Sequence, residues 1–180
     1  MSKVRLTGGQ WRSRQIVVLD APGLRPTPDR VRETLFNWLG QDLSGLTCLD
    51  LFAGSGILGL EAASRGAAQV TFVEQDRHVF AQLQKNITIL EERARIKTIR
   101  ANALEFLASQ NQPHYDLVFL DPPYRQNWLP RLWPLLGACM NPSARLYVEA
   151  EAPVVPPAPW QPCRSGRVGQ VHTHLFDWQT

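Results

Sequence analysis

The stretch Asp121-Pro122-Pro123-Tyr124 combines an acid, two prolines and an aromatic ring directly after an apolar run of strand length. The prolines fix the backbone and leave carbonyl groups free to accept hydrogen bonds. Asp121 and the Pro122 carbonyl would each accept one N–H of an exocyclic amine while Tyr124 stacks on its ring. Such acceptors direct the nitrogen lone pair at an electrophilic methyl group, and Asp121 would take the released proton. The alternative is a strand-ending turn with a structural tyrosine.

A second motif precedes it in the chain. Residues 46–52 form a short apolar run, and residues 54–59 then read G-x-G-x-x-G before a helical pattern begins. Strand, glycine turn and helix bring backbone N–H groups against a nucleotide-like ligand. Asp50 lies near the end of the first run and Glu74 ends the next one, where a carboxylate accepts ribose hydroxyls. We therefore expect an adenosine-containing cofactor, although the glycine pattern alone would also suit a dinucleotide or a tight turn without ligand.

Apolar runs and helical patterns alternate from residue 46 onward, which favours a mostly parallel sheet with helices on both faces. A helix should begin earlier, with Thr27 as N-cap and Pro28 as first helical residue. The other expected elements are strands at 46–52, 69–74, 95–99, 115–120 and 145–150, and helices at 57–65, 76–90, 103–109 and 128–137.

The two ends of the chain differ from this alternation. Residues 4–18 read as a hairpin, so we expect a basic hairpin extension over 1–22 and the main domain over 23–180. Five prolines in 153–162 exclude regular structure there, and one closing strand follows, antiparallel to 145–150 at the sheet edge. His172 and His174 would share one face of that edge strand and are not expected to be ligands.

Positive charge is concentrated at the N-terminus. Residues 1–36 hold seven Lys and Arg against three Asp and Glu, whereas the rest has a net charge of −1. Arginine matches phosphate geometry, so this segment suits nucleic acid, but an ordinary solvated segment is an equal alternative. Trp11 would either stack on a base or anchor the hairpin to the core. The candidate RNA-binding residues are Arg5, Trp11, Arg12, Arg14 and Arg30.

Length and composition set further limits. With 180 residues, 44% of them hydrophobic, the chain suits one compact domain, which we expect to be monomeric. No apolar run approaches the roughly 20 residues that span a bilayer, and no signal peptide is apparent. Cys48, Cys139 and Cys163 lack any C-x-x-C spacing, so we expect reduced packing residues in a cytoplasmic protein and no metal site.

These motifs together resemble the class I S-adenosylmethionine-dependent methyltransferases. More narrowly, the chain resembles the bacterial RsmD family, which methylates N2 of a guanine in 16S rRNA. Besides the two motifs above, the resemblance rests on residues 5–12 (RLTGGQWR), 23–27 (GLRPT), 29–38 (DRVRETLFNW) and 102–103. It implies a Rossmann-like fold with a mostly parallel seven-stranded sheet, an antiparallel C-terminal edge strand, helices on both faces and a small N-terminal hairpin.

The resemblance also implies S-adenosylmethionine as cofactor and 16S rRNA as partner, within a small ribosomal subunit or an assembly intermediate. Asp121, Pro122 and Tyr124 would hold the guanine, Tyr124 standing where the family often has Phe. Arg25 and Thr27 would close over the methionine end of the cofactor, and Asn102 and Ala103 would lie along its adenine. All positions that match the cofactor motifs are Arg25, Thr27, Asp50, Phe52, Gly54, Ser55, Gly56, Glu74, Asn102 and Ala103.

Three other functions deserve comparison. A DNA adenine-N6 methyltransferase shares the Asp121–Tyr124 motif, but this short chain offers no separate target-recognition domain. A nicotinamide oxidoreductase would use the glycine loop but has no role for that motif. A non-catalytic RNA-binding module would not need Asp121, and cofactor binding would distinguish it.

Overall fold

The computed structural model describes residues 1–19, 27–91 and 93–179, so the predicted cofactor residue Arg25 lies outside the described residues. A hairpin of β1 (Ser2–Arg5) and β2 (Gln15–Val18) comes first, followed by α1 (Asp29–Leu39). The remaining elements are β3 (Thr47–Asp50), α2 (Ile57–Ser64), β4 (Gln69–Glu74), α3 (Arg77–Ile89), β5 (Ile96–Arg100), α4 (Ala103–Ala108), β6 (Tyr115–Leu120), α5 (Leu129–Leu136), η1 (Gly137–Cys139), β7 (Met140–Ala150), β8 (Trp160–Val168) and β9 (Val171–Trp178).

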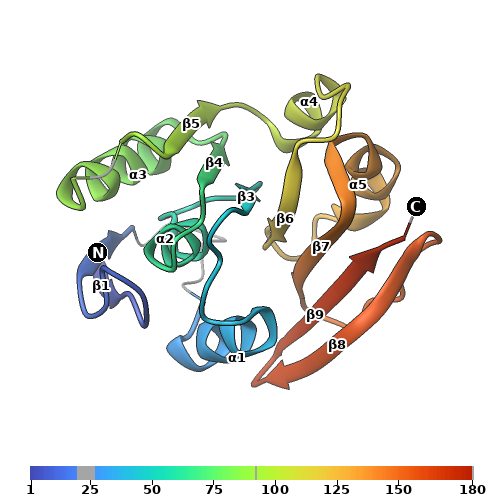
Figure 1. Ribbon diagram of the computed structural model, residues 1–180, viewed down its shortest axis with the longest axis horizontal. Helices are drawn as coiled ribbons and strands as arrows, with labels where there is room; N and C mark the ends of the chain where they lie inside the picture. The colour runs from blue at the N-terminus through green and yellow to red at the C-terminus, as the bar shows by residue number, and fades with distance from the viewer. Residues whose placement is uncertain (20–26, 92, 180) are drawn as a thin grey trace.

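The main sheet has seven strands in the order β5-β4-β3-β6-β7-β9-β8 (Figure 1). Strands β3 to β7 are parallel, and β9 pairs antiparallel with both β7 and β8. The predicted mostly parallel sheet is therefore confirmed. From β3 the chain builds outward to β4 and β5, then returns to place β6 on the other side of β3. In such sheets ligands bind at this switch point, outside the carboxyl ends of the strands.

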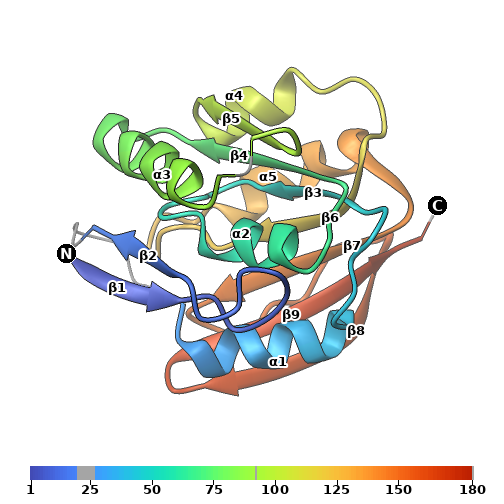
Figure 2. The ribbon, with the colours of Figure 1, turned by 60° about the vertical axis from the view of Figure 1, so that its left-hand side comes forward.

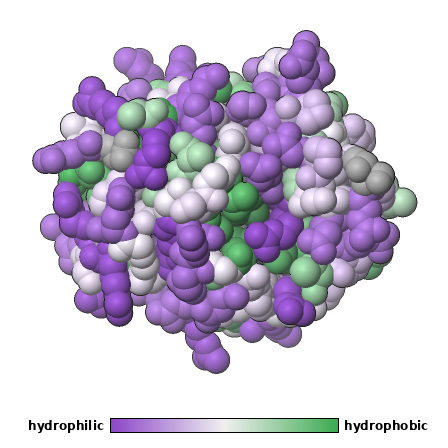
Figure 3. Space-filling model, viewed as in Figure 1, coloured by the Kyte–Doolittle hydropathy of each residue, from purple (hydrophilic) through white to green (hydrophobic). Residues whose placement is uncertain are grey.

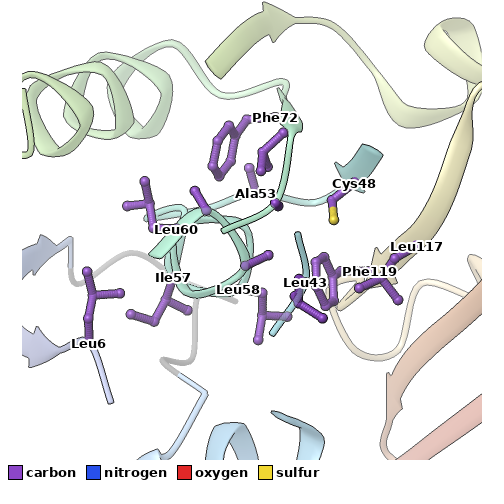
Figure 4. Packing of buried hydrophobic residues seen from close by; sticks show 14 of the residues in the cluster. Leu6, Leu43, Cys48, Ala53, Ile57, Leu58, Leu60, Phe72, Leu117 and Phe119 are labelled. Atoms are coloured by element: carbon purple, nitrogen blue, oxygen red, sulfur yellow. The ribbon is translucent and has the colours of Figure 1, made fainter. Parts of the chain in front are cut away.

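Helices cover both faces of the sheet, as Figures 1 and 2 show together. The hairpin, α1, α2 and α3 pack on one face, and α4 and α5 pack on the other. Because side chains alternate along a strand, neighbouring residues enter different cores: Phe119 joins the first cluster and Leu120 the second. Figure 4 shows the first cluster, in which Leu58 and Leu60 of α2 lie among strand residues such as Phe72.

The N-terminal hairpin is docked on α2 by hydrogen bonds that are partly or fully buried. The backbone N–H of Thr7 donates to Oε1 of Glu61 at 2.6 Å, and that of Trp11 donates to Oγ of Ser64 at 2.9 Å. A Cβ on Gly9, whose φ is +72°, would lie 1.9 Å from the Ser64 carbonyl oxygen. The Trp11 side chain is 7% exposed and belongs to the core. Trp11 thus anchors the hairpin, and its interpretation as a base-stacking RNA contact is wrong because the ring is buried.

The C-terminal strands correct two expectations. Residues 160–162 belong to β8, although the proline count predicted no regular structure there. Prolines are tolerated because β8 is the edge strand, and its register shifts just after Pro162. Strand β9 therefore lies inside the sheet, not at its edge. His174 is buried there, and its Nε2 accepts a hydrogen bond from the Val154 N–H at 3.2 Å.

Two smaller corrections concern a helix start and a cysteine. Helix α1 begins at Asp29, with Pro28 in the N-cap position at φ −57° and ψ 148°, so Thr27 is not the cap. Cys48 and Cys139 are buried as predicted for packing residues, but Cys163 is exposed on the edge strand.

None of the helices in the part of the chain that the structure describes is long and apolar enough to span a membrane.

Candidate active site

A cavity of about 600 Å³ opens at the carboxyl ends of the central strands. Its walls come from the segments that directly follow β3, β4 and β6, together with the end of β7 and the residues before α1. It therefore lies at the switch point that the strand order creates. Its lining includes these residues named in the sequence analysis: Thr27, Asp50, Phe52, Gly54, Ser55, Glu74, Ala103, Asp121, Pro122 and Tyr124.

The glycine loop has the backbone that its sequence predicts. Gly54 and Gly56 have φ of 54° and 87°, a conformation that other residues adopt only with strain. Gly59 lies inside α2, where a Cβ would come within 2.4 Å of the Phe72 ring. The third glycine thus lets α2 pack closely on β4, a different role from the ligand approach that the pattern suggested.

Glu74 holds the glycine loop against the end of β4. Its Oε2 accepts the Gly54 N–H at 2.9 Å, and its Oε1 accepts the Asp76 N–H at 2.8 Å. The carboxylate is half-buried at the cavity wall. A carboxylate held in this way offers oxygen lone pairs to a ribose diol in the cavity, so its acceptor atoms fit the sugar of a nucleoside cofactor.

Asn102 is placed differently from the expectation. Its side chain caps α4, accepting the Leu104 N–H at 2.9 Å and donating to Gln75 at 3.1 Å. The small residues Ala101 and Ala103 line the cavity there, and Asn102 does not. A wall of short apolar side chains suits a flat ring such as adenine.

Asp50 is a buried acid at the end of β3. Its side chain accepts the Gly59 N–H at 3.0 Å, from the first turn of α2. Burial raises the pKa of Asp50 to about 7; this hydrogen bond opposes the shift, and the negative charges of Asp121 and Glu74 add to it.

Asp121 begins the loop after β6. It is half-buried at the cavity, and Thr27 Oγ1 donates a hydrogen bond to its Oδ2 at 3.4 Å. Burial raises the pKa of Asp121 to about 7, and the Thr27 hydrogen bond partly opposes this shift. Pro122 and Tyr124 line the same cavity. An acid with a pKa near neutrality is matched to accept a proton at working pH.

The loop beyond Tyr124 is tightly held. Arg125 and Asn127 have positive φ of 62° and 51°, which costs energy and recurs at functional sites. The Arg125 N–H donates to Oε1 of Glu151 at 3.1 Å. Trp128 packs edge-on against Phe52, with ring centroids 5.1 Å apart, so the loops after β3 and β6 brace one another.

The structure adds two residues that the motifs did not indicate. Glu149 lines the cavity, although only 2% of it is exposed, and Tyr147 Oη donates to its Oε1 at 3.1 Å. Burial raises the pKa of Glu149 well above its usual value, and the charge of Asp121 raises it further. The sequence did contain a signal for both residues. Glu149 is an acid inside the apolar run 145–150 and lies two residues after Tyr147, so the two side chains share one face of the strand.

The basic residues divide into two groups. Arg5, Arg12, Arg14 and Arg30 are exposed, and Arg14 also donates to the Ile89 carbonyl at 2.7 Å. Arg32, which contributes to the N-terminal charge, is instead fully buried. The face seen in Figure 3 is largely hydrophilic, with hydrophobic residues visible near its middle.

Comparisons with known proteins agree with this geometry. A family model described as conserved hypothetical protein 95 matches residues 4–177. Ribosomal RNA small subunit methyltransferase D of Escherichia coli K12 is 47% identical, covering 97% of this chain and 89% of that protein. The protein of that name from Haemophilus influenzae is 45% identical, with 97% and 93% covered. The solved Escherichia coli protein yhhF, described as a candidate methyltransferase, has a TM-score of 0.88 at 44% identity over 99% of both chains.

Proposed function

The chain belongs to the family of the ribosomal RNA small subunit methyltransferases D, and from this premise we propose that it methylates 16S rRNA. The methyl group comes from S-adenosylmethionine and goes to the exocyclic N2 amine of a guanine. One observation supports an exocyclic amine as the methyl acceptor. Asp121, Pro122 and Tyr124 line the cavity together, and the pKa of Asp121 is about 7.

Three residues bind the target base and prepare its amine for transfer. Asp121 and the Pro122 carbonyl accept the two N–H groups of the amine, which orients its lone pair, and Tyr124 stacks on the base. S-adenosylmethionine, when bound, supplies an electrophilic methyl group. Asp121 in its carboxylate form then accepts the proton that the amine loses.

The cofactor is held on the other side of the cavity. Glu74 accepts hydrogen bonds from the ribose hydroxyls, and Ala101 and Ala103 flank the adenine. Asp50 and the backbone of 52–56 surround the methionine and ribose portions. Thr27, which the structure places beside Asp121, bounds the cavity toward the target base. This assignment keeps Asn102 as the cap of α4.

We also infer how the RNA is held. The exposed side chains of Arg5, Arg12, Arg14 and Arg30 would contact phosphates. The N-terminal extension over 1–22, which contains the docked β1–β2 hairpin, would bind RNA beside the domain over 23–180. The substrate would be 16S rRNA within a small subunit or assembly intermediate, and the enzyme a cytoplasmic monomer.

Methyl transfer from labelled S-adenosylmethionine tests the proposal directly. Small subunits lacking the modification, naked 16S rRNA and duplex DNA are incubated with the protein, and nucleosides from the digested product are separated. We expect label in N2-methylguanosine from the rRNA. Label in N6-methyladenine from DNA would support the DNA adenine-N6 alternative and contradict the proposed substrate.

Two variants keep this assay interpretable. Asp121→Ala should abolish transfer while cofactor binding, measured by calorimetry, stays close to that of the wild type. Glu105→Gln, an exposed change on α4, should behave like the wild type in both measurements. Wild-type turnover by Asp121→Ala would contradict the proposed role of this acid.

A further inference from the structure

Asp121 and Glu149 occupy neighbouring positions on one face of the sheet. Strands β6 and β7 are parallel, and their last registered pairs are Phe119 with Tyr147 and Leu120 with Val148. Asp121 and Glu149 are the next residues along the two chains, and both line the same cavity. Because side chains alternate, both acids project to the face of Phe119 and Tyr147, where α1 and α2 pack.

Thr27 joins the two acids. Its Oγ1 donates to Oδ2 of Asp121 at 3.4 Å, and Thr27 and Glu149 line the same cavity. The contact of Thr27 with Glu149 lowers the pKa of Glu149, but burial and the charge of Asp121 raise that pKa by more. A threonine hydroxyl has one proton and two acceptor lone pairs. It cannot donate to two carboxylates at once, so the arrangement is satisfied when one of the two acids is protonated and donates to Thr27.

Glu149 is the acid that the surroundings favour in the protonated form. It is 2% exposed, whereas Asp121 is half-buried and open to the cavity. Besides Thr27 on the segment before α1, the groups that face Glu149 are Asp121, Asp50 at the end of β3 and Tyr147 on its own strand. Asp121 and Asp50 carry negative charge when ionised, and none of these four groups carries positive charge. Tyr124, in the loop after β6, also faces Tyr147.

We propose that Glu149 is a positioning residue, which in its protonated form donates to Thr27 and so directs the Thr27 hydroxyl at the Asp121 carboxylate. This inference rests on the proposed function. The chain Glu149 to Thr27 to Asp121 holds one Asp121 oxygen and leaves the other free for the target amine. In the transfer, the amine nitrogen forms a bond to the methyl carbon, the bond from that carbon to sulfur breaks, and the amine proton passes to Asp121.

The first test measures single-turnover transfer between about pH 5.5 and 9, together with the cofactor Kd. Thr27→Val removes the hydrogen bond that favours ionised Asp121. The midpoint on the acid side of the variant's pH–rate profile should therefore move up by roughly half a pH unit. The rate near neutrality should fall, while the cofactor Kd changes little. Thr27→Ser keeps the hydroxyl and should restore the wild-type midpoint. Thr88→Val makes the same change at an exposed site on α3 and serves as the control.

Glu149 is tested by a second pair of variants. Glu149→Leu should lower the single-turnover rate about 10-fold or more, because Thr27 loses its donor. Glu149→Gln keeps an N–H donor of similar shape and should recover most of that loss. If the folded Glu149→Gln protein is as slow as Glu149→Leu, or if Thr27→Val keeps the wild-type midpoint, the inference is wrong.

A third measurement does not depend on activity. Carboxyl ¹³C NMR of the free protein, with signals assigned through Asp121→Asn and Glu149→Gln, should show Glu149 titrating above Asp121, and Thr27→Val raising the Asp121 midpoint. The opposite order would overturn the inference even in an active enzyme. A protein with the expected titrations but no rRNA methylation would contradict the proposed function alone.

Discussion

The guanidinium of Arg32 lies in the protein interior 3.4 Å from the carboxylate of Glu61, and neither side chain is exposed. Arg32 also donates to the carbonyl oxygens of Thr27 and Arg5, each at 2.7 Å. Glu61 in turn is paired with Arg65 and accepts from Thr7. One buried cation on α1 therefore ties together the hairpin, helix α2 and the backbone of the residue that contacts Asp121.

Replacing Arg32 should be strongly destabilising. Arg32→Ala leaves two carbonyl oxygens and part of the Glu61 charge without a partner in the interior, so we expect a loss of about 3–5 kcal/mol in the free energy of unfolding. Urea unfolding followed by circular dichroism measures it. Arg30→Ala, an exposed change on the same helix, should stay within about 0.5 kcal/mol. A loss below about 1 kcal/mol for Arg32→Ala would contradict the bridging role.

Methyl transfer should depend on pH through Asp121. The carboxylate accepts the amine protons and protonated Asp121 does not, so the rate should rise with pH and level off above a midpoint of about 7. Single-turnover rates at saturating cofactor would show this acid limb. An unperturbed aspartate would place the midpoint near 4, and that result would contradict the raised pKa of Asp121.

The same acid should make the free protein less stable at high pH. Its folded pKa is raised above the unfolded value, so its contribution to stability is fully present below about pH 4 and is lost as the pH rises through about 7. Asp121→Asn cannot ionise and should therefore have a higher Tm than the wild type at about pH 8, with the gap closing near pH 4. Calorimetric scans at both pH values check this, and a constant gap would argue against the raised pKa.

Gly9 offers a separate test of hairpin docking. Gly9→Ala places a methyl group against the Ser64 carbonyl oxygen, at a φ of +72°, and should destabilise the protein by about 1–3 kcal/mol. Gly169→Ala has a similar φ of +60° but open space around the new Cβ, so it isolates the cost of the backbone conformation. Equal losses in denaturant unfolding would mean that the close contact with α2 has no measurable effect.

The exposed arginines of the hairpin should govern RNA affinity. Replacing Arg12 and Arg14 with Gln removes two positive charges, so binding to 16S rRNA should weaken and its dependence on salt concentration should become shallower by up to about one unit of slope per lost phosphate contact. Filter binding across a salt series measures both. Arg164→Gln, on the distant edge strand β8, is the matched control, and an unchanged slope for the double variant would assign Arg12 and Arg14 to structure.

The sequence by itself determined the features that depend on residues close together in the chain. The G-x-G-x-x-G turn, the acid at the end of β4 and the Asp121–Tyr124 loop all follow strands whose periodicity is visible locally. The alternation of strands and helices then predicts a parallel sheet, and the carboxyl ends of parallel strands necessarily meet at one edge. The cavity and the lining residues that belong to these motifs were therefore predictable.

Only the tertiary structure decided which polar side chains face water and which are buried. Trp11 was a candidate RNA contact and Arg32 contributed to the basic N-terminal charge, but packing against α2 buries both of them. Glu149 meets Asp121 because β6 and β7 pair in one particular register, and β8 becomes a strand because β9 offers it an edge. Such contacts join residues far apart in the chain, where local propensity carries no information about partners.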